Sequence, residues 1–199
     1  MIPIQLQPEP SDFDQKVRAK GLAWMARKRI NIKKPKPKNI ELEPYWRDCL
    51  PDLRAAYKSV CAYVCILVEE VTGHATVEHF VPSSQRPDLA YEWSNYRFVS
   101  GMMNGRKSNF KDVLDPFSMS EHTFFLDFLS GEIFVNPELP VRQKLRAEKT
   151  IQRLKLYDAA CCRVRLKYWN KFVKGVIVES ELQERSPFVW LEAKRQGWL

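Results

Sequence analysis

The feature that most constrains the fold is the central region, residues 60–112, where strand-like segments precede a helix-like one. Residues 61–68 are apolar and partly β-branched, and residues 75–81 read as a second extended segment, which Pro82 ends. A proline-containing loop and a short extended piece at residues 96–98 then lead into a helical segment. β-Branched and aromatic residues favour strands, whereas proline cannot donate to a β-ladder. The region is therefore predicted to fold as strands, a loop and a helix.

The flanking regions divide the chain into three parts, residues 1–59, 60–112 and 113–199, and make it an α+β protein. In the first part a helix is expected after Ser11, a residue type that caps helix N-termini. A short helix should follow from about Asp48, because Pro51 suits a first helical turn.

The third part is predicted to contain a β-hairpin and two helices. The hairpin is expected at residues 123–128 and 132–135, joined through a Ser-Gly turn. The helices should span residues 140–154 and 158–173, with Asp158 as the N-cap of the second. The apolar positions of the first helix are Val141, Leu145, Ile151 and Leu154.

The chain is basic, with 32 Lys and Arg against 24 Asp and Glu and a net charge of +8. Seven of the twelve residues from 27 to 38 are basic and none is acidic, and two prolines forbid a regular helix there. Basic side chains gain affinity for nucleic acids by releasing counterions from phosphates. We expect this extended arm to bind DNA, the alternative being a solvated linker. Its candidate contacts are Lys33, Lys34, Lys36 and Lys38.

The five cysteines form no recognisable disulfide framework, because their number is odd and two of them are adjacent. The N-terminal residues lack the basic and apolar regions of a signal peptide. The longest apolar run, near residues 60–68, is too short to span a bilayer. A reducing cytoplasm without membrane contact is the expected location.

The dipeptide Glu78-His79 is the strongest candidate for chemistry. A carboxylate is a hard oxygen ligand suited to Mg²⁺ or Mn²⁺, and an imidazole takes a proton from water near neutral pH. Alone, the pair is more often a surface Glu beside a structural His. Because successive side chains of a strand point to opposite faces, the two would meet one substrate only where the strand bends.

Three further residues follow at suggestive distances. Asn95 comes sixteen residues after His79, Asn104 nine residues later, and Lys107 three residues after that. This series resembles the HNH nuclease family, in which an acidic residue and His are followed by Asn, then His or Asn, then Lys. The segment around Trp93 and Asn95 is also similar to prokaryotic branches of the family, and the likeness covers about fifty residues.

The resemblance implies a ββα-metal core with assigned roles. His79 would be the general base that activates water, and Glu78 and Asn104 would hold one divalent ion, Mg²⁺ or Mn²⁺. Asn95 would orient the His79 loop. Phosphate contacts are expected from Lys107, Arg106 and Arg97.

The sequence departs from the family at two points. Many members bind a structural zinc through two CxxC pairs, whereas here Cys61 and Cys65 are separated by three residues and no second pair exists. Structural zinc is therefore not expected, and the two thiols should be core residues. The last family position is Asn104 rather than His, which suits Mg²⁺ and leaves open a weakened or inactive site.

The function expected from this resemblance is metal-dependent hydrolysis of DNA phosphodiester bonds. The chain is similar to small prokaryotic HNH subunits of antiviral defence systems such as Septu, which implies a controlling partner ATPase. Two alternatives remain: a non-catalytic nucleic-acid-binding module with a degenerate HNH core, and an interaction subunit whose basic arm binds an acidic protein. A later basic series could face DNA or solvent: Arg163, Arg165, Lys167, Lys171 and Lys174.

Overall fold

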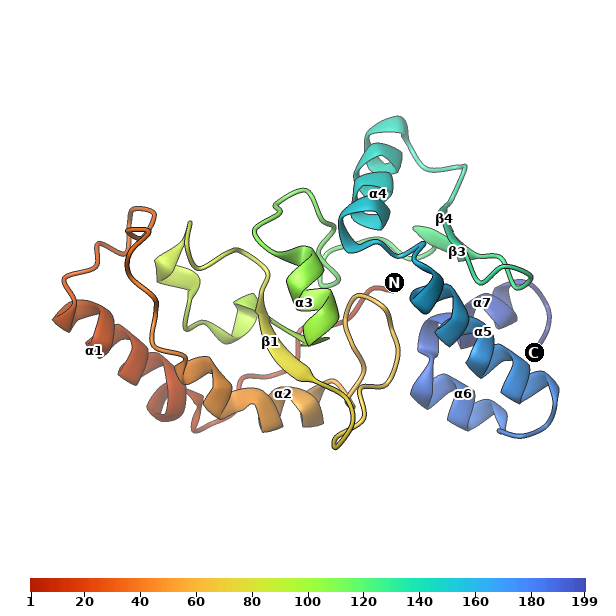
Figure 1. The fold of residues 1–199 in the computed structure, drawn as a ribbon, viewed down its shortest axis with the longest axis horizontal. Coiled ribbons are helices and arrows are strands. Elements are labelled where there is room, and N and C mark those ends of the chain that lie inside the picture. Colours follow the sequence, from red (N-terminus) through yellow and green to blue (C-terminus); the bar gives the residue numbers. More distant parts are fainter.

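In the computed structural model, which describes all 199 residues, the central region contains two antiparallel strands followed directly by a helix (Figure 1). β1 (Ala75–His79) pairs with β2 (Tyr96–Ser100) in a continuous register without a bulge. α3 (Gly101–Lys107) begins at the next residue, and the Ser100 hydroxyl caps it by accepting a hydrogen bond from the Met103 N–H. α3 packs against both strands, so the predicted strand, loop, strand and helix from residue 75 onward are confirmed.

Residues 61–68, predicted to be a strand, are not one. Val60 and Leu67 form a single antiparallel bridge, and the Cys65 N–H donates to the Cys61 carbonyl at 2.9 Å in a tight turn. Cys65 has a φ of 54°, which extended backbone cannot have. The segment is nonetheless largely buried. Its apolar composition therefore indicates that these residues lie in the core, and does not indicate a strand.

The N-terminal part contains two helical runs separated by an irregular segment, residues 28–44. Phe13, not Ser11, precedes the first helix, and no side chain caps it. Phe13 is fully buried, edge-on to Trp93 and Tyr96, so packing rather than a side-chain cap holds the start of the helix. The elements are the π-helical turn η1 (Asp14–Arg18), α1 (Ala19–Arg27), the 3-10 turn η2 (Tyr45–Cys49) and α2 (Leu50–Ala56).

The C-terminal part begins with the predicted hairpin and continues with four helices. The hairpin pairs β3 (Phe124–Leu126) with β4 (Ile133–Val135). Asp158 caps α5 as predicted, since its carboxylate accepts from the Ala160 N–H at 2.7 Å. The helices are α4 (Val141–Leu154), α5 (Ala159–Val173), α6 (Glu179–Arg185) and α7 (Pro187–Arg195).

The buried face of α4 agrees with the prediction only in its second half. Val141 and Leu145 are largely exposed, whereas Ala147, Thr150 and Leu154 are buried. The predicted positions Ile151 and Leu154 do face the core, and Ala147 and Thr150 join them, which an apolar pattern alone does not reveal.

One hydrophobic core joins the three parts of the chain. Fully buried aromatic residues from each part belong to it, including Phe13, Tyr63, Phe98, Phe124 and Phe188. Overall the molecule is a mixed α+β protein of seven α-helices and two small sheets. None of its helices combines the length and the apolar character needed to cross a bilayer.

Candidate functional site

The face of β1 that packs on α3 carries four polar side chains, which we call the β1–α3 face: Thr76, Glu78, Asn104 and Lys107. Thr76 and Glu78 are two residues apart on a strand and so point to the same side. The Asn104 Nδ2 donates to the Thr76 Oγ1 at 3.0 Å, and the Lys107 Nζ donates to the Glu78 Oε1 at 3.1 Å. Successive turns of α3 therefore contact successive residues of β1 that point toward the helix.

Glu78 is a buried carboxylate whose two oxygens have different surroundings. Its Oε1 is paired with Lys107, whereas its Oε2 is buried and accepts no hydrogen bond. Burial raises the pKa of Glu78 to about 7, and the nearby Lys107 and Arg97 only partly oppose this rise. An unpartnered buried oxygen is costly, and it is the kind of atom that a cation would satisfy.

His79 is held by a carbonyl oxygen and two aromatic rings. Its Nε2 lies 2.8 Å from the Ala90 carbonyl, and its ring stands edge-on to Trp46 and Tyr96. Because a carbonyl oxygen can only accept, Nε2 carries the proton and Nδ1 keeps the lone pair. Burial lowers the pKa of His79 to about 4, so the ring is neutral at pH 7. No hydrogen bond of the structure uses Nδ1.

Glu78 and His79 lie on opposite faces of β1. Glu78 points to α3, whereas His79 points to Trp46 of η2 and to its cross-strand partner Tyr96. The ladder continues regularly beyond His79, since the Phe80 N–H donates to the Asn95 carbonyl at 3.0 Å. The bend that would turn both side chains to one side is absent.

Asn95 joins the two ends of the loop between β1 and β2. Its Oδ1 accepts from the Val81 N–H at 2.8 Å, and its Nδ2 donates to the Val81 and Leu89 carbonyls, each at 3.0 Å. Val81 lies two residues after His79, and Ala90, which binds His79, follows Leu89. The buried Asn95 amide therefore fixes both segments that position the His79 ring.

Three predicted phosphate contacts are instead engaged inside the molecule, Lys107 and Arg97 as buried groups and Arg106 as a partly buried one. Lys107 is fully buried and also donates to the Phe80 carbonyl at 2.9 Å. Arg97 makes a two-bond ion pair with Asp115, at 2.9 and 2.7 Å, beneath the Phe117 ring. Arg106 donates to the last carbonyls of α4. The sequence prediction failed here because charge alone does not show which cations have internal partners.

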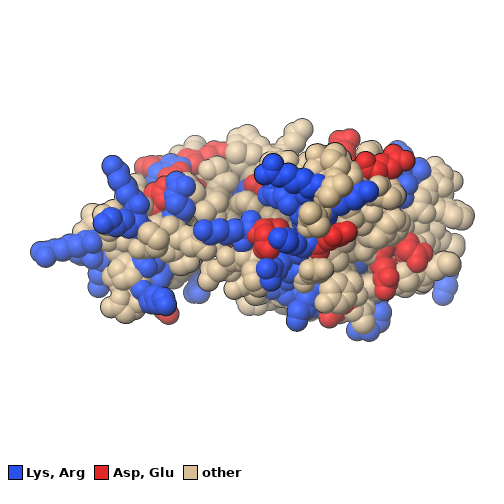
Figure 2. All heavy atoms as spheres, turned by 90° about the horizontal axis from the view of Figure 1, so that it is seen from above, with Lys and Arg blue, Asp and Glu red and all other residues tan.

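The basic arm remains available to an external partner. Lys33, Lys34 and Lys38 are exposed and make no ion pair, whereas the Lys36 side chain folds back onto the Ile40 carbonyl. The Lys36 N–H donates to the Ser84 carbonyl at 3.0 Å, which ties the arm to the loop after β1. Basic side chains gather at the same end of the molecule in Figure 2, where the arm lies in Figure 1.

Several residues at the site belong to no sequence motif and were not predicted. Thr76 binds Asn104, Trp46 contacts the His79 ring and the Ala90 carbonyl fixes its tautomer. Thr76 could have been found by its position two residues before Glu78 in a strand, whereas Trp46 lies more than thirty residues away in the chain. No three His, Cys, Asp or Glu side chains cluster, and all five cysteines are free and buried.

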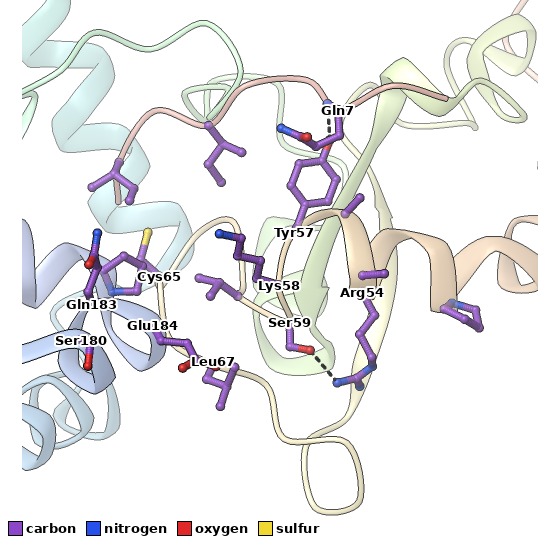
Figure 3. A pocket seen from close by; sticks show the side chains of 17 residues that line it. Gln7, Arg54, Tyr57, Lys58, Ser59, Cys65, Leu67, Ser180, Gln183 and Glu184 are labelled. Atoms are coloured by element: carbon purple, nitrogen blue, oxygen red, sulfur yellow. Dashed lines mark hydrogen bonds between the residues drawn. The ribbon is translucent and has the colours of Figure 1, made fainter. Parts of the chain in front are cut away.

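A pocket of about 1210 Å³ lies away from the β1–α3 face (Figure 3). It separates the N-terminal segment and the end of α2 from α6, and none of the predicted site residues lines it. Along its wall on the α2 side the Arg54 guanidinium donates to the Ser59 hydroxyl at 3.2 Å, and the Tyr57 hydroxyl accepts from the Gln7 N–H at 3.3 Å.

Comparison of the chain with protein-family models and with curated proteins found no match.

Proposed function

We propose that the chain is a metal-dependent HNH-type endonuclease that hydrolyses DNA phosphodiester bonds. The β1–β2–α3 unit carries the proposal. It holds a buried carboxylate, Glu78, and the Asn104 amide on one face, next in sequence to a neutral histidine with a free Nδ1. The residue series that resembles the HNH family coincides with this unit, so the motif and the fold support the same reading.

The donor set suits a hard divalent cation. Mg²⁺ characteristically binds through one or two carboxylates, keeps several waters and takes phosphate oxygens from the substrate. Glu78 offers the unpartnered Oε2, and Asn104 offers an amide oxygen because its Nδ2 is used by Thr76. When bound there, Mg²⁺ or Mn²⁺ would stabilise negative charge on the phosphate and on the leaving oxygen.

The side chains of the chain supply the remaining roles. His79 would accept the proton of the attacking water at Nδ1, and the Ala90 carbonyl keeps the ring in the tautomer that makes this possible. Because Glu78 and His79 lie on opposite faces of β1, this role requires the end of β1 to bend when the substrate binds. Asn95 holds the loop that carries this arrangement. The exposed lysines of the arm bind the DNA backbone. By its resemblance to defence-system subunits, the chain would act in the cytoplasm under a partner ATPase.

A non-catalytic nucleic-acid-binding module is the second candidate, and two observations favour it. The ion pair with Lys107 occupies one oxygen of Glu78, and His79 lies on the opposite face of β1. An HNH core that had lost its catalytic activity would keep the Glu78–Lys107 ion pair and the packed His79 ring because both stabilise the fold. Binding of DNA without cleavage distinguishes this module from the nuclease.

Metal-dependent nicking of a supercoiled plasmid tests the proposal. We expect the wild-type chain to nick the plasmid with Mg²⁺ or Mn²⁺ and not with EDTA, and Glu78→Gln and Asn104→Ala to lower the rate at least about tenfold. Asn170→Ala, an exposed amide on α5, is the matched control and should leave the rate unchanged. Cleavage that survives both site substitutions, or a wild-type chain that binds without nicking, would contradict the proposal.

A further inference from the structure

One face of α4 carries a row of basic side chains, which we call the α4 stripe: Arg142, Arg146, Lys149 and Arg153. Their spacing of four, three and four residues places them on one side of a helix, and all four are exposed. The one acidic residue of α4, Glu148, lies outside this row. The stripe spans about 16 Å along the helix axis.

The first three cations of the stripe have no partner within the chain. Arg142, Arg146 and Lys149 make no ion pair and no side-chain hydrogen bond, whereas many other basic residues of the molecule are paired. Free, exposed guanidinium and ammonium groups keep all their donors for an external anion. Their arrangement therefore fits a polyanion rather than an internal salt-bridge network.

Three contacts hold α4 against the central unit. Arg153 pairs with Asp112 at 3.1 Å in the loop after α3. The Thr150 hydroxyl, on the buried side of α4, accepts from the Leu114 N–H at 2.8 Å. Arg106 of α3 donates to the Leu154 carbonyl at 3.2 Å. The stripe thus has a fixed position relative to the β1–α3 face.

Figure 2 looks onto the side of the molecule where α4 projects in Figure 1. Basic side chains gather on this side in two places: at the end that holds the arm and around the middle, where α4 lies. The loop that follows α3 lies between the two in the ribbon view. A rod-like polyanion along the long axis of the molecule would meet both.

α5 offers a comparison, because it also carries exposed and unpaired basic residues. Arg163, Lys167 and Lys174 are exposed, whereas Arg165 is buried and donates to the Gly131 and Leu156 carbonyls. α5 packs mainly against α6 and α7 and meets α3 at its N-terminal end, where Arg106 pairs with Asp158 at 3.4 Å. α4 packs against α3 and β4. The two helices carry similar charge, but α4 makes the more extensive contact with α3 and so lies closer to the central unit.

We infer that the α4 stripe binds the phosphate backbone of DNA and holds the DNA beside the central β1–β2–α3 unit, on which α4 packs. This inference rests on the proposal that the chain acts on DNA. The length of the stripe corresponds to about five base-pair steps at 3.4 Å each, so several phosphates of one strand can be contacted. The contacts carry no sequence information and fix register and orientation.

Binding of a fluorescein-labelled DNA duplex tests the inference, measured by anisotropy in EDTA so that no metal-dependent cleavage occurs. We expect the triple variant Arg142→Gln, Arg146→Gln and Lys149→Gln to bind at least about tenfold more weakly near 0.1 M salt. The slope of log affinity against log salt should fall by about 2.7, the value for three lost phosphate contacts. Because the side chains are exposed, circular dichroism should show an unchanged fold.

The matched control removes the same charge from α5 through Arg163→Gln, Lys167→Gln and Lys174→Gln, and should bind as the wild type does. Equal binding by both triple variants, weaker or not, overturns the assignment to α4 whatever the plasmid assay shows. Weaker binding by the α4 variant alone, in a chain that does not cleave, supports the stripe and contradicts only the nuclease. No salt-sensitive binding by the wild type contradicts both.

Discussion

Glu78 and His79 are adjacent in sequence, yet burial shifts their pKa values in opposite directions. The pKa of Glu78 rises to about 7 and that of His79 falls to about 4. In each case burial disfavours the charged form, which is the anion for a carboxyl group and the cation for an imidazole. At neutral pH the histidine is an available base, whereas the carboxyl group is close to its midpoint.

These shifts predict opposing effects of pH on stability. Glu78 binds its proton more tightly when folded, so its contribution is present below about pH 4.5 and is lost as pH rises to about 7. His79 binds its proton less tightly when folded, so its contribution is present above about pH 6.5 and is lost as pH falls to about 4. Urea unfolding of metal-free protein should show this in single variants.

Relative to the wild type, Glu78→Gln should gain stability as pH rises from 4.5 to 7, and His79→Gln should gain it as pH falls from 6.5 to 4. The difference between each variant and the wild type is the relevant quantity, because other groups also titrate. A constant difference across these ranges would show that neither side chain is buried as described.

At the scale of elements, the loop between β1 and β2 is held by one buried amide. Asn95 makes three hydrogen bonds to the two ends of this loop. At about 1 kcal/mol each, they are worth about 3 kcal/mol together. Asn95→Ala should therefore lower the free energy of unfolding by about that amount, measured by urea denaturation.

Asn109→Ala is the matched control, because Asn109 is exposed and makes no side-chain hydrogen bond. It should change the free energy of unfolding by less than about 0.5 kcal/mol. If Asn95→Ala proved as stable as this control, the loop would not depend on the amide.

Sequence patterns predicted correctly those helices and strands that a local feature of the sequence marks, such as alternation, a turn or a helix cap. β1, the 124–135 hairpin and α5 formed where alternation, a turn or a cap indicated them. Residues 61–68 did not form a strand, because a buried turn and a strand share the same apolar composition. α6 and α7 are short and had no distinct signal.

At the site, too, some residues could be predicted from the sequence and others could not. The spacing of Asn95 and Asn104 identified residues that the fold does place beside the strands, and Asn95 holds the His79 loop. The burial of Arg97 and Lys107 depends on Asp115 and Glu78, which lie eighteen and twenty-nine residues away along the chain. Such long-range pairing leaves no trace in local charge, and for this reason these two cations were predicted to face a phosphate.

At the scale of the whole molecule, two groups of exposed basic side chains, the arm and the α4 stripe, lie beside the central unit. The arm is tied to the loop after β1 through Lys36 and Ser84, and the α4 stripe is tied to the loop after α3 through Arg153 and Asp112. A net charge of +8 would favour association with any polyanion. Because both groups are joined to these loops, a DNA bound by them would pass next to the central unit.

The most direct test of the account is the single-turnover cleavage rate of a labelled DNA duplex by His79→Ala, with and without added imidazole. Removal of a general base should lower the rate by about 10² to 10⁴. Because the missing ring leaves space beside Trp46 and Ala90, free imidazole should restore part of the rate. A His79→Ala variant that cleaves as fast as the wild type would contradict the central claim.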